Sequence, residues 1–266
     1  MMPDIRADLA LYQRGLCKSR ERARKLIKNG NVQINGKVCL KPSECVSEDD
    51  VMTVIGDIHK YVGRGGLKLE KALEVFSVDL SCMVCLDIGA STGGFTDCML
   101  QNGARLVYAL DVGHSQLDEK LLSDNRVINM EKTNIRNSVR SDFKEDIKFI
   151  ATDVSFISLK LVLPVIRDLL TDDGMAIVLI KPQFEAGKEN IGKSGIVKEP
   201  RVHKRILNEM IMFSSELGLG VSGLSVSPIK GGDGNIEYLM YLKKTSGPDI
   251  ITFDTDSLVN EAFKKG

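Results

Sequence analysis

The sequence predicts an α/β fold: a doubly wound, mostly parallel sheet preceded by a small basic α+β unit. From residue 80 onward, short apolar runs alternate with segments of helical periodicity, which is the pattern of a parallel sheet with helices on both faces. Residues 1–41 instead contain ten Lys and Arg against three Asp and Glu, although the whole chain has a net charge of zero. A basic segment joined to a neutral domain is typical of a nucleic-acid-binding module attached to an enzyme.

The basic segment is predicted to form one helix followed by a hairpin. Ser19 is a suitable N-cap, and Gly30 stands where a C′ glycine belongs. An apolar stripe at helical spacing lies between them and consists of Ala23, Leu26 and Ile27. Residues 32–38 then alternate around Asn-Gly, which is a strong signal for a two-residue hairpin turn.

The same helix is predicted to have a cationic face. Arg20, Arg24 and Lys28 are spaced at i, i+4 and i+8, so their side chains lie on one side of the helix. Guanidinium and ammonium groups arranged in this way bind a phosphate backbone largely independently of its sequence. The alternative explanation is an ordinary solvated helix face, which any run of charges can produce.

The rest of the chain supplies the sheet. Seven segments are predicted as strands: 84–88, 106–111, the region near 127, 147–153, 175–181, 220–227 and 236–242. Four are predicted as helices: 93–102, 116–123, 159–170 and 200–217. Because open α/β sheets bind ligands at the carboxyl ends of their parallel strands, the residues that follow the strands are the candidates for function.

The first predicted strand leads into a loop of small residues, "LDIGASTGGFTD". Small residues let a ligand approach the backbone closely, and Asp111, after the second strand, can accept hydrogen bonds from ribose hydroxyls. Asp87 would repel a dinucleotide pyrophosphate but attract a cationic ligand, and the glycine spacing is not G-x-G-x-x-G. The loop therefore favours S-adenosylmethionine over NAD. The candidate cofactor-binding residues are Asp87, Gly89, Ala90, Ser91, Thr92, Gly93, Gly94, Phe95 and Asp111.

Charged residues also lie at the ends of later strands. Asp153 follows the fourth strand, Lys181 follows the fifth, Glu237 lies in "GGDGNIEYL", and Lys68 lies just ahead of the first strand. Two lysines and two carboxylates at one sheet edge suit the deprotonation of an alcohol. For Lys181 taken alone, the alternative is a lysine that extends from the sheet edge to solvent.

Other methyl-transfer chemistries lack their residues. The Asn/Asp-Pro-Pro-Tyr/Phe motif of amino-group base methyltransferases is replaced by "TDVSF" after the fourth strand, and all six cysteines precede residue 100, away from the place of a carbon-5 nucleophile. A lysine acts as a base only if its pKa is lowered. A second cation and desolvation lower that pKa whereas the carboxylates raise it, so the residues alone leave the base unassigned.

The first 55 or so residues resemble the S-four RNA-binding domain, named after ribosomal small-subunit protein four. The resemblance is carried by the Ser-Arg opening of the helix, its Ile-x-x-Gly close and the Val-x-Ile-Asn-Gly hairpin. It implies that this module docks on structured RNA. The candidate RNA-binding residues are Arg20, Arg24 and Lys28, joined by Lys188 and Lys193 of the loop that follows "IKPQFEAG".

Nearly the whole chain resembles the TlyA family, also called hemolysin A, whose large domain is similar to the FtsJ-like ribose methyltransferases. The motifs that carry this resemblance are "YVGRGGLKLEKAL", "LDIGASTGGFTD", "ATDVSFISL", "IKPQFEAG" and "GNIEYL". The resemblance implies a class I methyltransferase fold and 2′-O-methylation of cytidine in ribosomal RNA. It also implies a catalytic tetrad of Lys68, Asp153, Lys181 and Glu237. Gly63 departs from the serine expected before Arg-Gly-Gly, which bears only on the rigidity of the linker.

The expected domains are an RNA-binding domain at 1–60, a linker at 61–66, a methyltransferase domain at 67–245 and a helical tail at 246–266. The cysteine and histidine spacing predicts no zinc site, and the sequence predicts neither a signal peptide nor a membrane span. We therefore expect a cytoplasmic protein that acts on ribosomal RNA or ribosomal subunits and needs no partner protein. The alternatives are a catalytically inactive RNA-binding or assembly factor and a membrane-active hemolysin.

Overall fold

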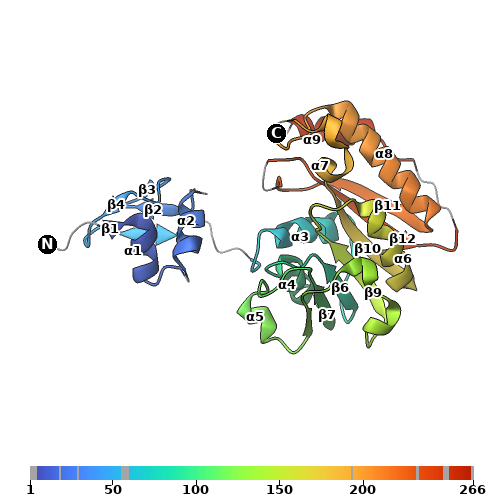
Figure 1. The fold of residues 1–266 in the computed structure, drawn as a ribbon, viewed down its shortest axis with the longest axis horizontal. Coiled ribbons are helices and arrows are strands. Elements are labelled where there is room, and N and C mark those ends of the chain that lie inside the picture. The colour runs from blue at the N-terminus through green and yellow to red at the C-terminus, as the bar shows by residue number, and fades with distance from the viewer. Residues whose placement is uncertain are drawn as a thin grey trace. The chain divides into compact units, whose positions relative to one another are not determined.

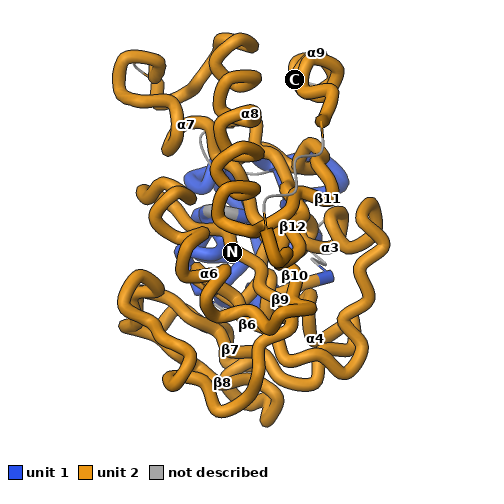
Figure 2. Tube along the Cα trace, turned by 90° about the vertical axis from the view of Figure 1, so that its right-hand side faces the viewer, with its two compact units in different colours: residues 1–60 blue, residues 61–266 orange. Residues whose placement is uncertain are grey.

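The computed structural model describes residues 5–17, 19–28, 30–54, 60–192, 194–231, 234–247 and 252–264. The chain divides into two compact units, residues 1–60 and residues 61–266, which Figure 2 colours separately. Residues 61–66 were expected to form a linker, but they belong to the second unit. Tyr61 is buried in its core, and the helix α3 (Gly65–Val75) already begins within this segment.

The first unit packs two helices against short antiparallel strands. Its elements are β1 (Ile5–Arg6), α1 (Ala7–Gln13), α2 (Arg20–Lys28), β2 (Val32–Ile34), β3 (Lys37–Val38), β4 (Cys45–Val46) and β5 (Met52–Val54). β3, β2 and β5 form one sheet, and β1 pairs with β4. The predicted hairpin turn is present, because Asn35 and Gly36 both have positive φ, at 50° and 79°.

The second unit is built on a seven-stranded sheet in the order β11-β12-β10-β9-β6-β7-β8. The strands are β6 (Val84–Ile88), β7 (Leu106–Leu110), β8 (Val127–Met130), β9 (Ile147–Thr152), β10 (Leu170–Ile180), β11 (Leu219–Val226) and β12 (Tyr238–Lys244). All are parallel except β12, which pairs antiparallel with β10 and β11. This sheet confirms the predicted doubly wound fold. The order of strands reverses between β6 and β9, because β7 and β8 extend the sheet on one side and β9 and β10 on the other. In open α/β sheets such a point is where the carboxyl ends of the strands flank a crevice.

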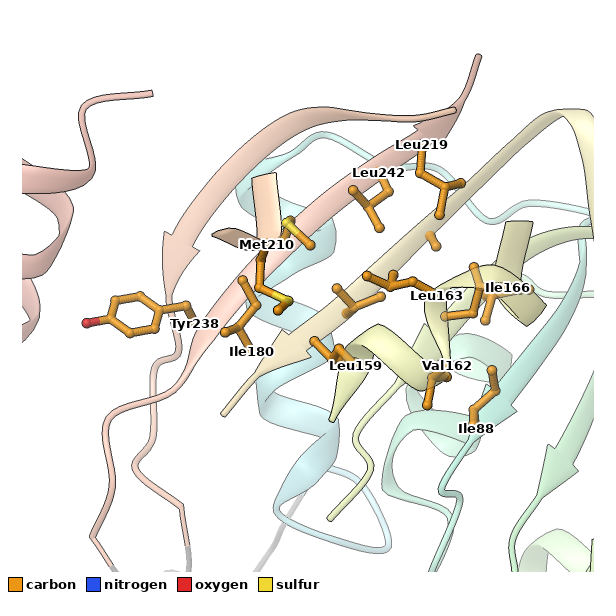
Figure 3. Packing of buried hydrophobic residues seen from close by; sticks show 14 of the residues in the cluster. Ile88, Leu159, Val162, Leu163, Ile166, Ile180, Met210, Leu219, Tyr238 and Leu242 are labelled. Atoms are coloured by element: carbon orange, nitrogen blue, oxygen red, sulfur yellow. The ribbon is translucent and has the colours of Figure 1, made fainter. Parts of the chain in front are cut away.

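Helices cover both faces of this sheet (Figure 1). Along β6, Cys85 faces the core under α3, α4 (Gly94–Gln101) and α5 (Glu119–Leu122), whereas Leu86 faces the opposite core. That second core lies under the helices α6 (Leu163–Leu169), α8 (Pro200–Glu216) and α9 (Thr255–Lys264). Figure 3 shows side chains of α6 and α8 packed on it. The tail is therefore helical in 255–264 and contributes to the core of the second unit.

Two predicted helices are shorter in the structure. The helix expected at 159–170 is a 3₁₀ turn, Leu159–Leu161, followed by α6, because Pro164 favours the first turn of a helix. The helix expected at 116–123 is reduced to α5, since Asp118 acts as its N-cap and accepts a hydrogen bond from the amide of Lys120. Among the described residues, no helix has the length and apolar character needed to cross a membrane.

The loop between β6 and α4 depends on a glycine that cannot be replaced without strain. Gly93 has a φ of 94°, in the left-handed region. A Cβ added there would lie 2.1 Å from Cδ1 of Leu121. Both the backbone conformation and the close contact with α5 therefore require glycine at this position.

We predict that Gly93→Ala lowers the free energy of unfolding of the second unit by about 2–4 kcal/mol, because it combines left-handed strain with overpacking. The matched control is Gly247→Ala, whose added Cβ would meet nothing within 4 Å. We expect this control to change stability by less than about 0.5 kcal/mol. Urea denaturation followed by circular dichroism measures both. Equal stabilities of the two variants would contradict the tight packing of α5 on the loop.

Candidate active site

The four candidate catalytic residues come together at one edge of the sheet. Asp153 follows β9 and Lys181 follows β10, so both lie at carboxyl ends of parallel strands. Glu237 directly precedes β12, and because β12 is antiparallel its amino end lies at the same edge. Lys68 reaches this edge from α3, on the face of the sheet that also carries α4.

Ion pairs join the four side chains into a continuous chain. Lys68 Nζ lies 2.6 Å from Oε2 of Glu237 and 3.1 Å from Oδ2 of Asp153. Lys181 Nζ lies 2.5 Å from Oδ1 of Asp153 and donates a hydrogen bond of 3.0 Å to the hydroxyl of Ser155. Asp153 therefore bridges the two lysines.

The tetrad, as we call Lys68, Asp153, Lys181 and Glu237, is largely removed from solvent. Lys68 and Lys181 are each 7% exposed, and Glu237 is 2% exposed. Two positive and two negative charges balance within the cluster, which is the condition for keeping charges buried. Burial opposes ionisation of Asp153, but attraction to Lys68 and Lys181 outweighs it and holds the pKa of Asp153 below its ordinary value.

Two adjoining cavities open beside the tetrad. The first, which we call the tetrad cavity, has a volume of about 460 Å³ and is lined by all four tetrad residues. The second, which we call the Asp111 cavity, has a volume of about 690 Å³ and is lined by Asp111, Val112 and Ile135 among others. The residues that line both are Gly89, Ser91, Asp153, Ser155 and Phe156. Molecules bound in the two cavities would therefore approach each other at Asp153.

The loop predicted to bind the cofactor separates these cavities from the core. Gly89, Ala90, Ser91, Thr92, Gly94 and Phe95 line one cavity or both, whereas Gly93 packs on α5. Asp111 accepts hydrogen bonds from the amides of Ser91 and Gly113, one on each carboxylate oxygen. Each oxygen retains a second lone pair, so Asp111 can also accept hydrogen bonds from a ligand in its cavity.

Asp87 has a different environment from the one expected. It is fully buried and lines neither cavity, and its Oδ2 accepts hydrogen bonds from the amide and hydroxyl of Thr96. Its Oδ1 is buried and has no partner within the described part of the chain. Burial raises the pKa of Asp87 to about 7, against the effect of the Thr96 hydrogen bonds. An unpaired buried oxygen and an acidic second cavity together fit a ligand that carries positive charge and hydroxyl groups.

Sequence reasoning did not identify three residues beside the tetrad. Ser155 bonds Lys181, and Phe156 is 92% exposed with a φ of 62° and lines both cavities. Glu185, after β10, accepts hydrogen bonds from the hydroxyl of Ser158 and the amide of Leu159, which fixes the segment after β9. The stretch "TDVSF" contained the signal for the first two, since polar and aromatic residues directly after a parallel strand lie at the ligand-binding edge.

The candidate RNA-binding residues are spread over both units. In the first unit, Arg20 and Arg24 lie on α2 with half-exposed side chains, but both bond the buried carboxylate of Asp8, which the sequence analysis did not consider. Lys28 is exposed on the same helix. In the second unit, Lys188 is exposed in the turn Lys188–Asn190, and Lys193 lies outside the described residues.

Known proteins resemble this chain along most of its length. The family model of FtsJ-like methyltransferases matches residues 61–244, and that of the S4 domain, the S-four domain named above, matches residues 5–52. The chain is 52% identical to "Putative rRNA methyltransferase YqxC" of Bacillus subtilis, over 97% of the chain and 94% of that protein. It is 37% identical to "16S/23S rRNA (cytidine-2'-O)-methyltransferase TlyA" of Mycobacterium tuberculosis, over 98% of each.

A solved structure agrees with both units. The protein described as "Putative hemolysin from Streptococcus thermophilus" is 46% identical and aligns with a TM-score of 0.81, covering 100% of this chain and 98% of that one. The order of the sheet, the two family matches and these relatives all point to the same assignment. The chain is therefore a member of the TlyA family, with an FtsJ-like methyltransferase domain that follows an S4 domain.

Proposed function

We propose that this chain transfers a methyl group from S-adenosylmethionine to the ribose 2′-hydroxyl of cytidine in ribosomal RNA. The observation that carries the proposal is the neutral, buried tetrad in a cavity that adjoins the Asp111 cavity. The activity printed for the Mycobacterium tuberculosis relative supports the choice of cytidine and of ribosomal RNA. The S4 domain supports an RNA substrate of this kind.

The cofactor would lie along the loop after β6, with its ribose at Asp111 and its methionine part toward Asp87 and Asp153. When bound, S-adenosylmethionine supplies a methyl group on a cationic sulfonium, which becomes a neutral thioether as the methyl leaves. Asp111 would hold the ribose hydroxyls through its remaining lone pairs. Asp87 lines neither cavity, so it would favour a cationic ligand through its charge and not by direct contact.

Lys181 is the better candidate for the base. Lys68 has two carboxylate partners, whereas Lys181 has one carboxylate and the neutral hydroxyl of Ser155. Removing a proton from Lys181 therefore gives up fewer ion-pair contacts than removing one from Lys68. After its ammonium has released a proton to solvent, Lys181 would accept the 2′-hydroxyl proton at Nζ as the hydroxyl oxygen forms its bond to the methyl carbon. Asp153 would keep Lys181 aligned with this hydroxyl, and Lys68 and Glu237 would hold Asp153 in place.

The exposed ring of Phe156 supports a substrate with a flat aromatic group. The ring lies 5.2 Å from that of Phe184, centroid to centroid, and the Nζ of Lys181 lies 5.9 Å from the centroid of the Phe184 ring. An aromatic side chain that is this exposed next to a polar cavity provides a stacking surface for a nucleobase. A base placed there would bring its own ribose toward the tetrad.

The overall proposal is tested by mass-spectrometric mapping of ribose methylation in bacterial 16S and 23S ribosomal RNA after incubation with the purified protein and S-adenosylmethionine. We expect new 2′-O-methylcytidine. Cofactor and RNA binding without any new methylated ribose would instead support an inactive RNA-binding factor.

We predict that Lys181→Ala lowers the single-turnover rate of methyl transfer by about 10²–10⁴-fold, because it removes the proton acceptor. Its affinity for the cofactor should stay within a few-fold of wild type, as measured by calorimetry. The control is Lys148→Ala, whose exposed ion pair with Asp173 lies at the amino end of β9, away from the tetrad. Retention of more than about a tenth of the wild-type rate by Lys181→Ala would exclude this lysine as the base.

We predict that Asp87→Asn changes how the stability of the second unit depends on pH. The pKa of Asp87 is raised from 3.8 to about 7 in the fold, so the folded state binds an extra proton between about pH 4 and pH 7. Wild type therefore loses stability relative to the variant as the pH rises through this window, on the order of 1–4 kcal/mol in total. Denaturation of both proteins at several pH values measures the difference. A difference that does not vary with pH would mean that Asp87 is ionised throughout.

A further inference from the structure

The first unit contains a cluster of three arginines around one buried acid. Asp8, at the start of α1, has a side chain with 0% exposure. Nε of Arg6 lies 3.0 Å from its Oδ1, and Nε of Arg20 and Arg24 lie 3.1 Å and 2.8 Å from its Oδ2. These residues come from β1, α1 and α2, so the contacts tie the three elements together.

Arg6 also donates from one terminal nitrogen to Oδ2 of Asp8, at 3.4 Å, whereas Arg20 and Arg24 are held at the inner end of the guanidinium. For Arg20 and Arg24, the hydrogen bonds recorded within the described residues use only Nε. The terminal nitrogens, which carry four of the five N–H donors of a guanidinium, lie at the end of the side chain beyond Nε. The side chains of Arg6, Arg20 and Arg24 are 47%, 42% and 50% exposed, so this outer part reaches solvent.

Arg14 of the same unit shows what a purely structural arginine looks like here. Its two terminal nitrogens donate to the backbone carbonyls of Asp50 and Ser47, at 2.6 Å and 2.7 Å. The terminal nitrogens of Arg14 therefore bond within the fold and not to a ligand. Arg20 and Arg24 are anchored at the opposite end, which is the arrangement that presents donors to a ligand.

We propose that Arg6, Arg20 and Arg24 form a site for RNA backbone phosphate, which we call the Asp8 site, and that Asp8 is its positioning residue. The inference rests on the proposed action on ribosomal RNA and adds to it Arg6, Asp8 and a defined geometry. Three guanidiniums and one carboxylate leave a net charge of +2, which attracts a phosphodiester. A long arginine held at Nε loses little further side-chain entropy when its terminal nitrogens bind.

The proposal predicts a change in RNA affinity opposite to the one that net charge alone predicts. Simple electrostatics says that removing an acid from a basic surface strengthens RNA binding. If Asp8 holds the arginines in place, Asp8→Asn weakens binding although it raises the net charge by one. The matched control is Asp49→Asn, which removes an exposed acid from the same unit and raises the charge equally.

The experiment measures binding of the full-length protein to purified 16S and 23S ribosomal RNA at several salt concentrations. We expect Asp8→Asn to lower affinity by about 3–30-fold and to reduce the log–log salt slope by about one to two units, as two phosphate contacts are weakened. Asp49→Asn should bind as tightly as wild type or slightly more tightly. Tighter binding by Asp8→Asn would overturn the proposal.

A second comparison separates positioning from a general effect on folding. In the background Arg20→Gln with Arg24→Gln, we expect Asp8→Asn to change RNA affinity by less than about twofold, because Asp8 would act through these arginines. An undiminished effect would mean that Asp8 only maintains the fold, and the proposal fails. If the two Gln changes alone leave RNA affinity intact, the Asp8 site is not an RNA site. That result would not contradict the proposed methyl transfer, which is tested separately with Lys181→Ala.

A charge-preserving variant keeps the test valid even if Asp8→Asn unfolds the first unit. Arg20→Lys with Arg24→Lys retains both positive charges and all the carboxylates, but lysine lacks the Nε fork that binds Asp8 while donating outward. We expect this variant to lose about 3–30-fold in affinity, with cofactor affinity unchanged. Wild-type RNA affinity would show that charge alone suffices and would overturn the proposal.

Discussion

The active site depends on the carboxylate of Asp153, which joins the two lysines of the tetrad. Without it, two ammonium groups would lie close together on lysines that are each only 7% exposed. The other three tetrad residues come from different kinds of element: Lys68 from a helix, Lys181 from the end of a parallel strand, and Glu237, which pairs with Lys68, from just before an antiparallel strand. The one antiparallel strand among the seven is thus what allows Glu237 to reach the edge where its neighbours end.

Asp87 and Asp153 show how environment assigns charge to two carboxylates near the same sheet edge. Both are removed from water, which disfavours ionisation of each. Asp153 has two ammonium partners, so the pKa is lowered, whereas Asp87 has only the hydroxyl and amide of Thr96, so its pKa is raised. A cationic ligand would supply Asp87 with the positive charge that Lys68 and Lys181 already give to Asp153.

Much of this architecture could be predicted from the sequence because parallel strands are short, apolar and regularly spaced. Residues 84–88 were predicted as a strand and are one, and strand ends located Asp153 and Lys181 at the same edge. Local cues missed contacts between distant residues. The pairing of Lys68 with Glu237 spans 169 positions, and the sequence placed both residues at one sheet edge without predicting that they pair. The bonds of Arg20 and Arg24 to Asp8 were missed because helical spacing describes one helix and not the element packed on it.

In both units a carboxylate holds basic side chains in place, but the first unit uses arginines and the second uses lysines. This difference matches the proposed functions of the two units, RNA binding and methyl transfer. In each, one carboxylate with little or no exposure fixes several basic side chains: Asp8 binds arginines and Asp153 binds lysines. A guanidinium stays charged at any physiological pH and offers donors on two sides, so it can bind an acid and a phosphate at once. An ammonium can give up its proton, and only a group that does so can deprotonate a hydroxyl. Arginines in place of the lysines around Asp153 would therefore remove the base. Lysines in place of the arginines around Asp8 would remove the group that binds an acid and a phosphate at once.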